Sequence, residues 1–213
     1  MPKQTFYNLS EEKRERIVNA AIEAFAENDY AAVSISQLVE EAGIAKGSFY
    51  QYFEDKEDLL GYLLELTAQK KVELIGTLPP APEMGVFAYL RWLAKGNLRF
   101  ELAYPRLSEV AYRAMTGAGY PPVFSSGIRE QSVAFFRQLV AQGKAQGDIA
   151  PEINEELAAH IFNSVFSELG KIMLELAPKR NLQDVGAFFE SAEVQELFEQ
   201  TLAILEKGMG TGE

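Results

Sequence analysis

The chain has 213 residues, of which 47% are hydrophobic and 24% charged, so its composition is that of a globular protein with a sizeable core. It contains no Cys and one His, which excludes disulfide frameworks, thiolate zinc sites and cysteine nucleophiles. The net charge of -11 opposes binding to phosphate backbones. Any contact with nucleic acid must therefore depend on a few well-placed cations, hydroxyls and backbone amides.

The chain carries no sign of a membrane or export segment. No apolar run approaches the roughly 20 residues that span a bilayer. The first stretch, MPKQTFYNLS, lacks the basic and apolar regions of a signal peptide. We therefore expect a cytoplasmic protein with no membrane partner.

The first predicted helix runs from Ser10 to about Glu27. Its apolar residues, among them Ile17, Ala21 and Phe25, recur at spacings of three and four. Acidic residues in its first turn match the positive end of the helix dipole. This pattern is typical of an amphipathic helix that packs one face on a core.

Two short helices follow around a tight turn. Ser34 is placed to cap a helix over 35–42, and Gln37 completes a capping box. Gly43 occupies the position of a left-handed C-terminal residue, and a second helix is predicted over 45–52. A helix, a glycine-containing turn and a second short helix form a helix-turn-helix unit, whose second helix fits the DNA major groove.

The remainder of the chain is also predicted to be helical. Asp55 caps a helix that ends near residue 75, where the prolines of TLPPAPE cannot continue it. Further helices are predicted at 84–103, 105–116, 121–145, 153–177 and 184–207. We therefore expect an all-α fold of about nine helices. It would comprise three small helices over 1–55, which include the helix-turn-helix unit, and a larger antiparallel helical bundle over 56–213.

The stretch from Ser34 to Leu60, SISQLVEEAGIAKGSFYQYFEDKEDLL, resembles the TetR family of bacterial transcriptional regulators. An upstream helix with Ala20, Ala21 and Phe25 extends the resemblance. The chain has Ala45 where the family often has a capping Ser or Thr, and Tyr52 where His is common. The resemblance is carried by the following residues: Ile35, Leu38, Ala42, Gly43, Ile44, Gly47, Phe49, Tyr50, Tyr52, Phe53, Lys56, Glu57 and Leu59.

The resemblance implies a ligand-responsive repressor with a DNA-binding domain over 1–55 and an effector-binding and dimerisation domain over 56–213. Such a protein binds a palindromic operator in double-stranded DNA as a homodimer and is released by a small-molecule effector. The rival hypothesis is an all-α protein-interaction or small-molecule carrier module without DNA binding. Salt-sensitive binding to a defined duplex separates the two.

Eight residues are candidates for DNA contact. Lys46, Gly47, Ser48 and Gln51 lie on the outward part of the second short helix, where amide, ammonium and close backbone approach can read base edges. Four more offer hydroxyls, phenols or an ammonium to phosphates. For two of these a structural role remains open, a core ring for Tyr52 and a solvated helix end for Lys56. The phosphate candidates are Ser34, Tyr50, Tyr52 and Lys56.

The larger domain is rich in aromatic residues, which serve either as ordinary core or as walls of a ligand pocket. For His160 a core or surface position is the alternative to a ligand contact. We expect an apolar or aromatic effector. The predicted ligand-binding residues are Trp92, Phe100, Tyr104, Tyr112, Arg113, Phe135 and His160.

No catalytic, cofactor or metal site is predicted, because no paired histidines or buried carboxylate pair can be recognised. The last two helices carry apolar stripes wider than one intramolecular contact needs, which favours packing on a symmetry mate. The predicted dimer residues are Ile161, Val165, Leu169, Ile172, Val194, Leu197, Phe198 and Leu202.

Overall fold

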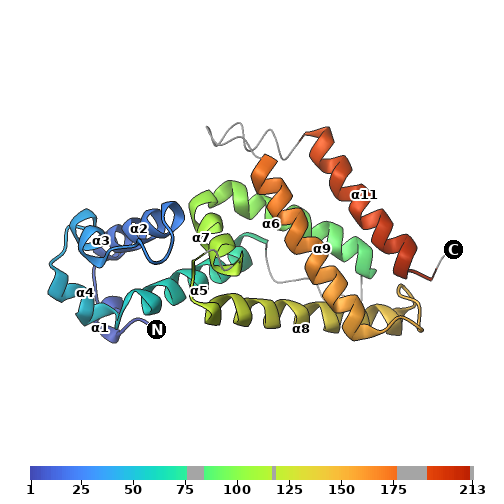
Figure 1. The fold of residues 1–213 in the computed structure, drawn as a ribbon, viewed down its shortest axis with the longest axis horizontal. Coiled ribbons are helices and arrows are strands. Elements are labelled where there is room, and N and C mark those ends of the chain that lie inside the picture. Colours follow the sequence, from blue (N-terminus) through green and yellow to red (C-terminus); the bar gives the residue numbers. More distant parts are fainter. Residues whose placement is uncertain (76–83, 117–118, 177–190, 212–213) are drawn as a thin grey trace. The chain divides into compact units, whose positions relative to one another are not determined.

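The computed structural model describes residues 1–75, 84–116, 119–176 and 191–211 (Figure 1). Within these ranges the chain forms helices and no β-strand, apart from one isolated bridge between Ile149 and Gly210. The predicted all-α class is confirmed. The helices are α1 (Gln4–Tyr7), α2 (Glu11–Glu27), α3 (Ile35–Glu41), α4 (Lys46–Tyr52), α5 (Lys56–Ile75), α6 (Val86–Ala103), α7 (Pro105–Thr116), α8 (Pro122–Gln146), α9 (Glu155–Leu176) and α11 (Ala192–Met209).

Each predicted helix has a counterpart, and α1 was not predicted. The last helix begins at Ala192, while residues 184–190 of its predicted start lie outside the described residues. Across the described ranges, no helix is both long and apolar enough to cross a bilayer.

The helix ends agree with the sequence at two positions and differ at one. Gly43 has φ of 65°, the left-handed conformation expected after α3. The amide of Asp58 donates to the Asp55 carboxylate at 2.8 Å, as expected for a cap. The capping box at Ser34 is wrong, because its side chain makes no cap hydrogen bond. Only the backbone carbonyl of Ser34 is used, accepting from the Leu38 amide at 3.0 Å.

The chain divides into two compact units. Unit 1 comprises Met1–Lys71 and Tyr104–Gly127, and unit 2 comprises Val72–Ala103 and Ile128–Glu213. The boundaries fall within α5 and α8, and α7 belongs to the same unit as the helix-turn-helix. The functional division at residue 55 stays a prediction, but as a compact body the N-terminal part extends further.

Unit 1 is built on a cluster of buried aromatic rings. Phe6, Phe25, Phe49 and Phe53 are each 0% exposed. The Phe6 and Phe53 rings lie 4.9 Å apart, and the Phe49 and Phe53 rings 5.6 Å apart. Short helices are marginal in isolation, so burial of these rings is what holds α1 and α4 in place.

Unit 2 has its own core, formed by α6, α8, α9 and α11. The ring of Phe136 is stacked on Phe162 at 5.8 Å and on Phe166 at 5.5 Å. Ion pairs of 2.9 and 2.8 Å join the Arg91 guanidinium of α6 to Glu199 and Glu206 of α11. Four helices are thus held around one aromatic layer.

Tyr120 joins the segment after α7 to α2 inside unit 1. Its side chain is 4% exposed, and its hydroxyl donates to the carbonyl of Phe25 at 2.6 Å. Its ring packs against those of Phe25 and Tyr30, at 6.4 and 5.9 Å. Burial raises the pKa of Tyr120 to about 12.

We expect Tyr120→Phe to destabilise the protein by about 1–3 kcal/mol, because it leaves a buried carbonyl without its donor. The folded state holds the phenol proton up to pH about 12, and the unfolded chain loses it near its ordinary pKa of 10.0. Wild-type stability should therefore fall as pH rises through this window, and the variant should show a shallower fall. Urea unfolding at pH 7 and at alkaline pH measures both effects. Equal stability at pH 7 would contradict the role of this hydrogen bond.

Candidate nucleic-acid interface

The short helix α4 has one face in the core and one in solvent. Phe49 and Tyr52 are buried, at 0% and 5% exposure. Lys46, Gly47 and Gln51 are exposed, and so is Tyr50, while Ser48 is half-buried. All four residues predicted to read bases therefore lie at least partly at the surface, with Gly47 and Gln51 on the side of α4 opposite its buried rings.

The local charge on α4 differs from that of the whole chain. No carboxylate occurs between Ala42 and Phe53, and Lys46 is the one cation of that stretch. Its ammonium donates to the Ser36 hydroxyl of α3 at 3.0 Å, a contact at the exposed surface. The helix thus presents amide, hydroxyl, phenol and ammonium groups in a chain whose net charge is -11.

Gly47 has no packing reason to be glycine. A Cβ atom added to it would meet nothing within 4 Å. Its φ is not positive, and glycine inside a helix costs about 1 kcal/mol relative to alanine. The protein's own fold therefore does not require this glycine, whereas close approach by an external backbone would.

The N-terminal segment closes on the end of α4, a feature that the sequence did not predict. The Lys3 ammonium donates to the backbone carbonyl of Tyr50 at 3.0 Å, and the Lys3 amide donates to the backbone carbonyl of Tyr52 at 2.8 Å. The Thr5 hydroxyl donates to the carbonyl of Gln51. These donors satisfy the last carbonyls of the helix. The segment is too short for periodicity to reveal it.

The predicted phosphate contacts are placed unequally. Tyr50 is 46% exposed, and Ser34 is half-buried. Tyr52 is a core residue: its ring packs 6.4 Å from that of Phe6, and the Lys13 ammonium lies 5.8 Å from its centroid. The ring thus fixes α4 against α1, which is the core role left open for Tyr52, and its phosphate contact stays a prediction.

Lys56 also has a structural role. Its ammonium donates to the carbonyls of Tyr30 and Val33 at 2.6 and 3.1 Å and lies 4.4 Å from the centroid of the Tyr30 ring. These contacts join the start of α5 to the turn before α3. These contacts use two of the three donors of the ammonium group, and the phosphate contact predicted for Lys56 stays a prediction.

The seven predicted ligand-binding residues fall in two different units. Trp92 and Phe135 of unit 2 are half-buried, and both pack near the Tyr89 ring, at 5.9 and 6.4 Å. Phe100 is 0% exposed. In unit 1, Tyr104 lines a cavity and Tyr112 is half-buried on α7. The structure thus brings together Trp92 and Phe135, and it does not group the seven.

Two polar members of that set are engaged elsewhere. Arg113 pairs with Glu109 at 3.0 Å and with Asp29 at 3.3 Å, which holds α7 to the end of α2 within unit 1. His160 is a surface residue, with a side chain 57% exposed and 3.3 Å from Glu156. Arg137 bonds the same carboxylate and lowers the pKa of Glu156. The observed contacts of Arg113 and His160 are therefore with carboxylates of the protein itself.

The predicted dimer residues are only partly available. Leu169, Val194 and Leu202 are buried in the core of unit 2, at 8%, 5% and 0% exposure. Ile172 is 39% exposed, and Ile204 of α11, which was not predicted, is 71% exposed. The remaining predicted residues are half-buried: Ile161, Val165, Leu197 and Phe198.

Metal-ligating and polar side chains were compared across the part of the chain that the structure describes. It contains no group of three or more His, Cys, Asp or Glu residues able to hold a metal ion. No buried polar side-chain atom there lacks a hydrogen-bond partner. The polar groups of the described chain are used in structural contacts or lie at the surface.

Comparison with known proteins identifies both parts of the chain. A family model described as "Bacterial regulatory proteins, tetR family" matches residues 17–63. A second, "Tetracyclin repressor-like, C-terminal domain", matches residues 84–210. A solved TetR family transcriptional regulator from Chloroflexus aurantiacus is 41% identical, with 99% of each chain covered and a TM-score of 0.79.

Two curated relatives of higher identity match over a short stretch, whereas the HTH-type transcriptional regulator BetI of Escherichia coli O157:H7 is 23% identical over 161 residues, 75% of this chain and 76% of the relative. The HTH-type transcriptional regulator YerO of Bacillus subtilis is 47% identical over 49 residues, which are 23% of this chain and 17% of the relative. HbdR of Aromatoleum sp. is 44% identical over 52 residues, 24% of this chain and 23% of the relative. The match thus spans about a fifth of the length of these curated relatives.

Lys46, at the start of α4, and Lys56, at the start of α5, should differ in their effect on folding. We expect Lys56→Met to reduce stability by about 1–3 kcal/mol, because two carbonyls lose a charged donor. Lys46→Met removes an exposed contact and should change stability by less than about 0.5 kcal/mol. Urea unfolding of both variants measures the difference. Equal losses would argue against the internal role of Lys56.

Proposed function

Because the chain belongs to the TetR family of bacterial regulatory proteins, we propose that it is a DNA-binding transcriptional regulator that represses from a palindromic operator. The resemblance seen in the sequence is confirmed by the two family models and by the solved relative of 41% identity. The relatives named above are transcriptional regulators. Their description supports the class of activity proposed here.

The observation that carries the proposal is the exposed face of α4. Gly47, Tyr50 and Gln51 lie together in solvent, and no packing contact accounts for the glycine. Close backbone approach, an amide for base edges and a phenol for phosphate are what major-groove contact requires. An interaction or carrier module without DNA binding would leave Gly47 unexplained.

The contacts within unit 1 support a route from effector to DNA. Lys56 joins α5 to the turn before α3, and Tyr120 and Arg113 join the α7 segment to α2. Displacement of α5 or α7 would therefore move the helices that hold α4. A change of a few kcal/mol in the relative stability of two arrangements is enough for regulation.

For the effector we propose an apolar or aromatic small molecule that binds in unit 2. Support comes from the half-buried rings of Trp92 and Phe135, which both pack near the ring of Tyr89. These side chains are partly accessible and have large rigid faces, as pocket walls do. Arg113 and His160 are left out of this site because of the contacts they make elsewhere.

For the dimer we propose a face formed by α9 and α11. Apolar side chains remain exposed on both helices, at Ile172, Leu157 and Ile204. The half-buried Ile161, Val165 and Leu197 lie on the same two helices. Packing two such pairs as a four-helix arrangement would bury these residues.

Selection from random duplex DNA tests the proposed function. We expect a near-palindrome whose half-site centres lie about one helical turn, or a multiple of it, apart. Gln51→Ala should relax base preference at one position per half-site, costing about 1–3 kcal/mol there. Gly47→Ala should fold at least as stably as wild type but bind the selected site more weakly, because a methyl group blocks close approach.

The Gly47→Ala variant separates DNA contact from folding. If it binds the selected duplex as tightly as wild type, Gly47 does not face DNA. If no palindrome is enriched, with or without candidate effectors, the proposed function is wrong.

Charge on the α9 and α11 face should disrupt the dimer. We expect Ile172→Glu and Ile204→Glu to raise the dimer dissociation constant at least about 100-fold, since each buries an unpaired carboxylate. Val123→Glu places the same charge on α8, where Val123 is 59% exposed, and should leave the dimer intact. Sedimentation velocity at micromolar protein measures all four proteins. A monomeric wild type would refute the proposed dimer.

A further inference from the structure

The segment before α2 holds an exposed lysine beside the end of α4. Pro2 and Phe6 are buried, whereas residues 3–5 between them are exposed. The Lys3 ammonium donates to the backbone carbonyl of Tyr50 at 3.0 Å. Because the segment is anchored in the core on both sides of Lys3, this side chain is kept in contact with a residue of the exposed face of α4.

Two stretches of sequence that meet here carry no carboxylate. Residues 1–10 contain none, and neither do residues 42–53. Each stretch has one cation, Lys3 in the first and Lys46 in the second. The hydrogen bonds between the segment and α4 therefore join two basic stretches within a chain whose net charge is -11.

The carboxylates that follow α4 do not pair with Lys3. Two of them serve the start of α5, where the amide of Asp58 donates to Asp55 and the amide of Glu54 donates to Asp58. Among the described residues, Lys3 takes part in no ion pair. Its ammonium has three donors, of which the Tyr50 carbonyl uses one. Two donors are left for an acceptor outside the protein.

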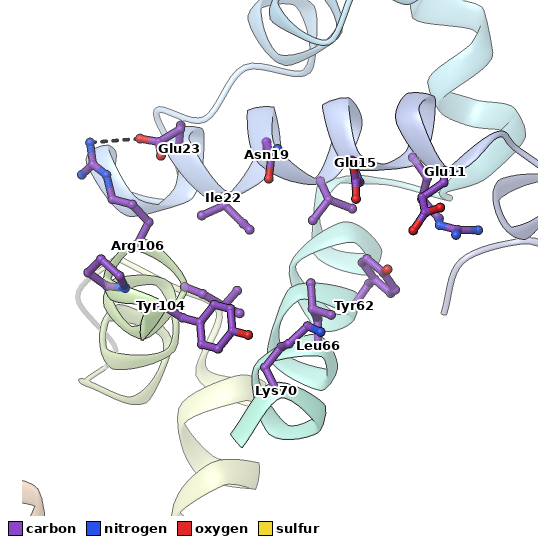
Figure 2. Close-up of a pocket in the computed structure, with 14 residues that line it drawn as sticks. Glu11, Glu15, Asn19, Ile22, Glu23, Tyr62, Leu66, Lys70, Tyr104 and Arg106 are labelled. Atoms are coloured by element: carbon purple, nitrogen blue, oxygen red, sulfur yellow. Dashed lines mark ion pairs between the residues drawn. The ribbon is translucent and has the colours of Figure 1, made fainter. Parts of the chain in front are cut away.

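Other cations of unit 1 face carboxylates instead. Arg106 pairs with Glu23 and Glu27, at 2.9 and 2.6 Å, beside the cavity that Tyr104 lines (Figure 2). That cavity of about 710 Å³ is lined by as many acidic as basic side chains, so its charge favours no ion of either sign. Lys3 has a neutral partner, so its charge remains for an anion that approaches α4.

We propose that Lys3 binds a backbone phosphate of DNA beside α4, so that the segment before α2 is part of the DNA-binding surface. This inference rests on the proposed function and extends it to a residue outside the helix-turn-helix. The contact adds positive charge where Lys46 is the one cation of α4, and it carries no sequence information. Holding the lysine in place before DNA arrives lowers the entropy cost of the contact.

The salt dependence of binding to the duplex selected by the wild type tests this contact. The logarithm of the binding constant falls with the logarithm of salt concentration, by about 0.9 for each phosphate contact. We expect Lys3→Gln to reduce this slope by about 0.9 and to weaken binding about five- to tenfold at about 0.1 M salt. A scrambled duplex should lose the same factor, because phosphate contacts are independent of sequence. Lys3→Arg keeps the charge and should keep the slope.

Two matched controls separate the phosphate contact from its alternatives. Thr5→Val removes the neighbouring hydrogen bond to the Gln51 carbonyl without altering charge, so it should leave the salt slope unchanged. Lys95→Gln removes the same charge from an exposed lysine of α6 in unit 2, and it should bind as the wild type does. If Lys3→Gln weakens binding only as Thr5→Val does, with the slope unchanged, Lys3 merely supports α4 and the inference is overturned. An equal loss of slope in Lys95→Gln would overturn it as well.

Lysine protection in the wild type gives a second measurement that needs no variant. Acetylation by acetic anhydride, followed by mass spectrometry, should be slowed by the selected duplex at Lys3 and Lys46 and not at Lys95. Protection of Lys46 without protection of Lys3 would overturn this inference and leave the proposed function intact. A wild type that selects no duplex would overturn both.

Discussion

The burial of Phe49 of α4 and of Phe53, which follows α4 directly, is the constraint on which the candidate interface depends. Phe49 and Phe53 are both 0% exposed and belong to the ring cluster around Phe6. A helix of seven residues is far below the roughly 12–15 residues needed for even marginal stability alone. Its orientation is therefore determined by what it buries. The outward residues are released from packing, which leaves Gly47 and Gln51 available for an external partner.

The acidic charge of the chain is compatible with DNA binding because of where its cations and carboxylates lie. The stretch of α4 has no carboxylate, although the chain as a whole carries -11. Several cations serve the fold: Lys56 holds a turn, and Arg113 and Arg106 hold α7 to α2. Affinity for DNA must then draw on hydrogen bonding and close backbone approach as well as on charge. Net charge alone would have given the wrong class of partner.

The helices were predictable because each one repeats a strong local pattern, and their ends follow from Gly43 and Asp55. Contacts between segments were not. Lys56 reads as an exposed helix start until the carbonyls of Tyr30 and Val33 are placed beside it. Tyr52 and Arg113 likewise have roles set by residues far away in the sequence. The α1 segment is too short for any periodicity.

Helix α2 is attached to the rest of unit 1 by contacts of different strength. Its core side is held by buried apolar residues, Phe25 among them. Its contact with Arg106 uses side chains about half exposed, 49% for Arg106 and 49% and 57% for its two partners. Ion pairs in such positions contribute only about 0–1 kcal/mol each. The separation of α2 and α7 is therefore held chiefly by the buried Tyr120 hydrogen bond and by apolar contact. These contacts are less completely buried than the ring cluster beneath α4, whose Phe6, Phe49 and Phe53 side chains are 0% exposed. Unit 1 thus combines a rigid reading surface with an adjustable attachment, the arrangement that a regulator needs if binding at one place is to alter binding at another.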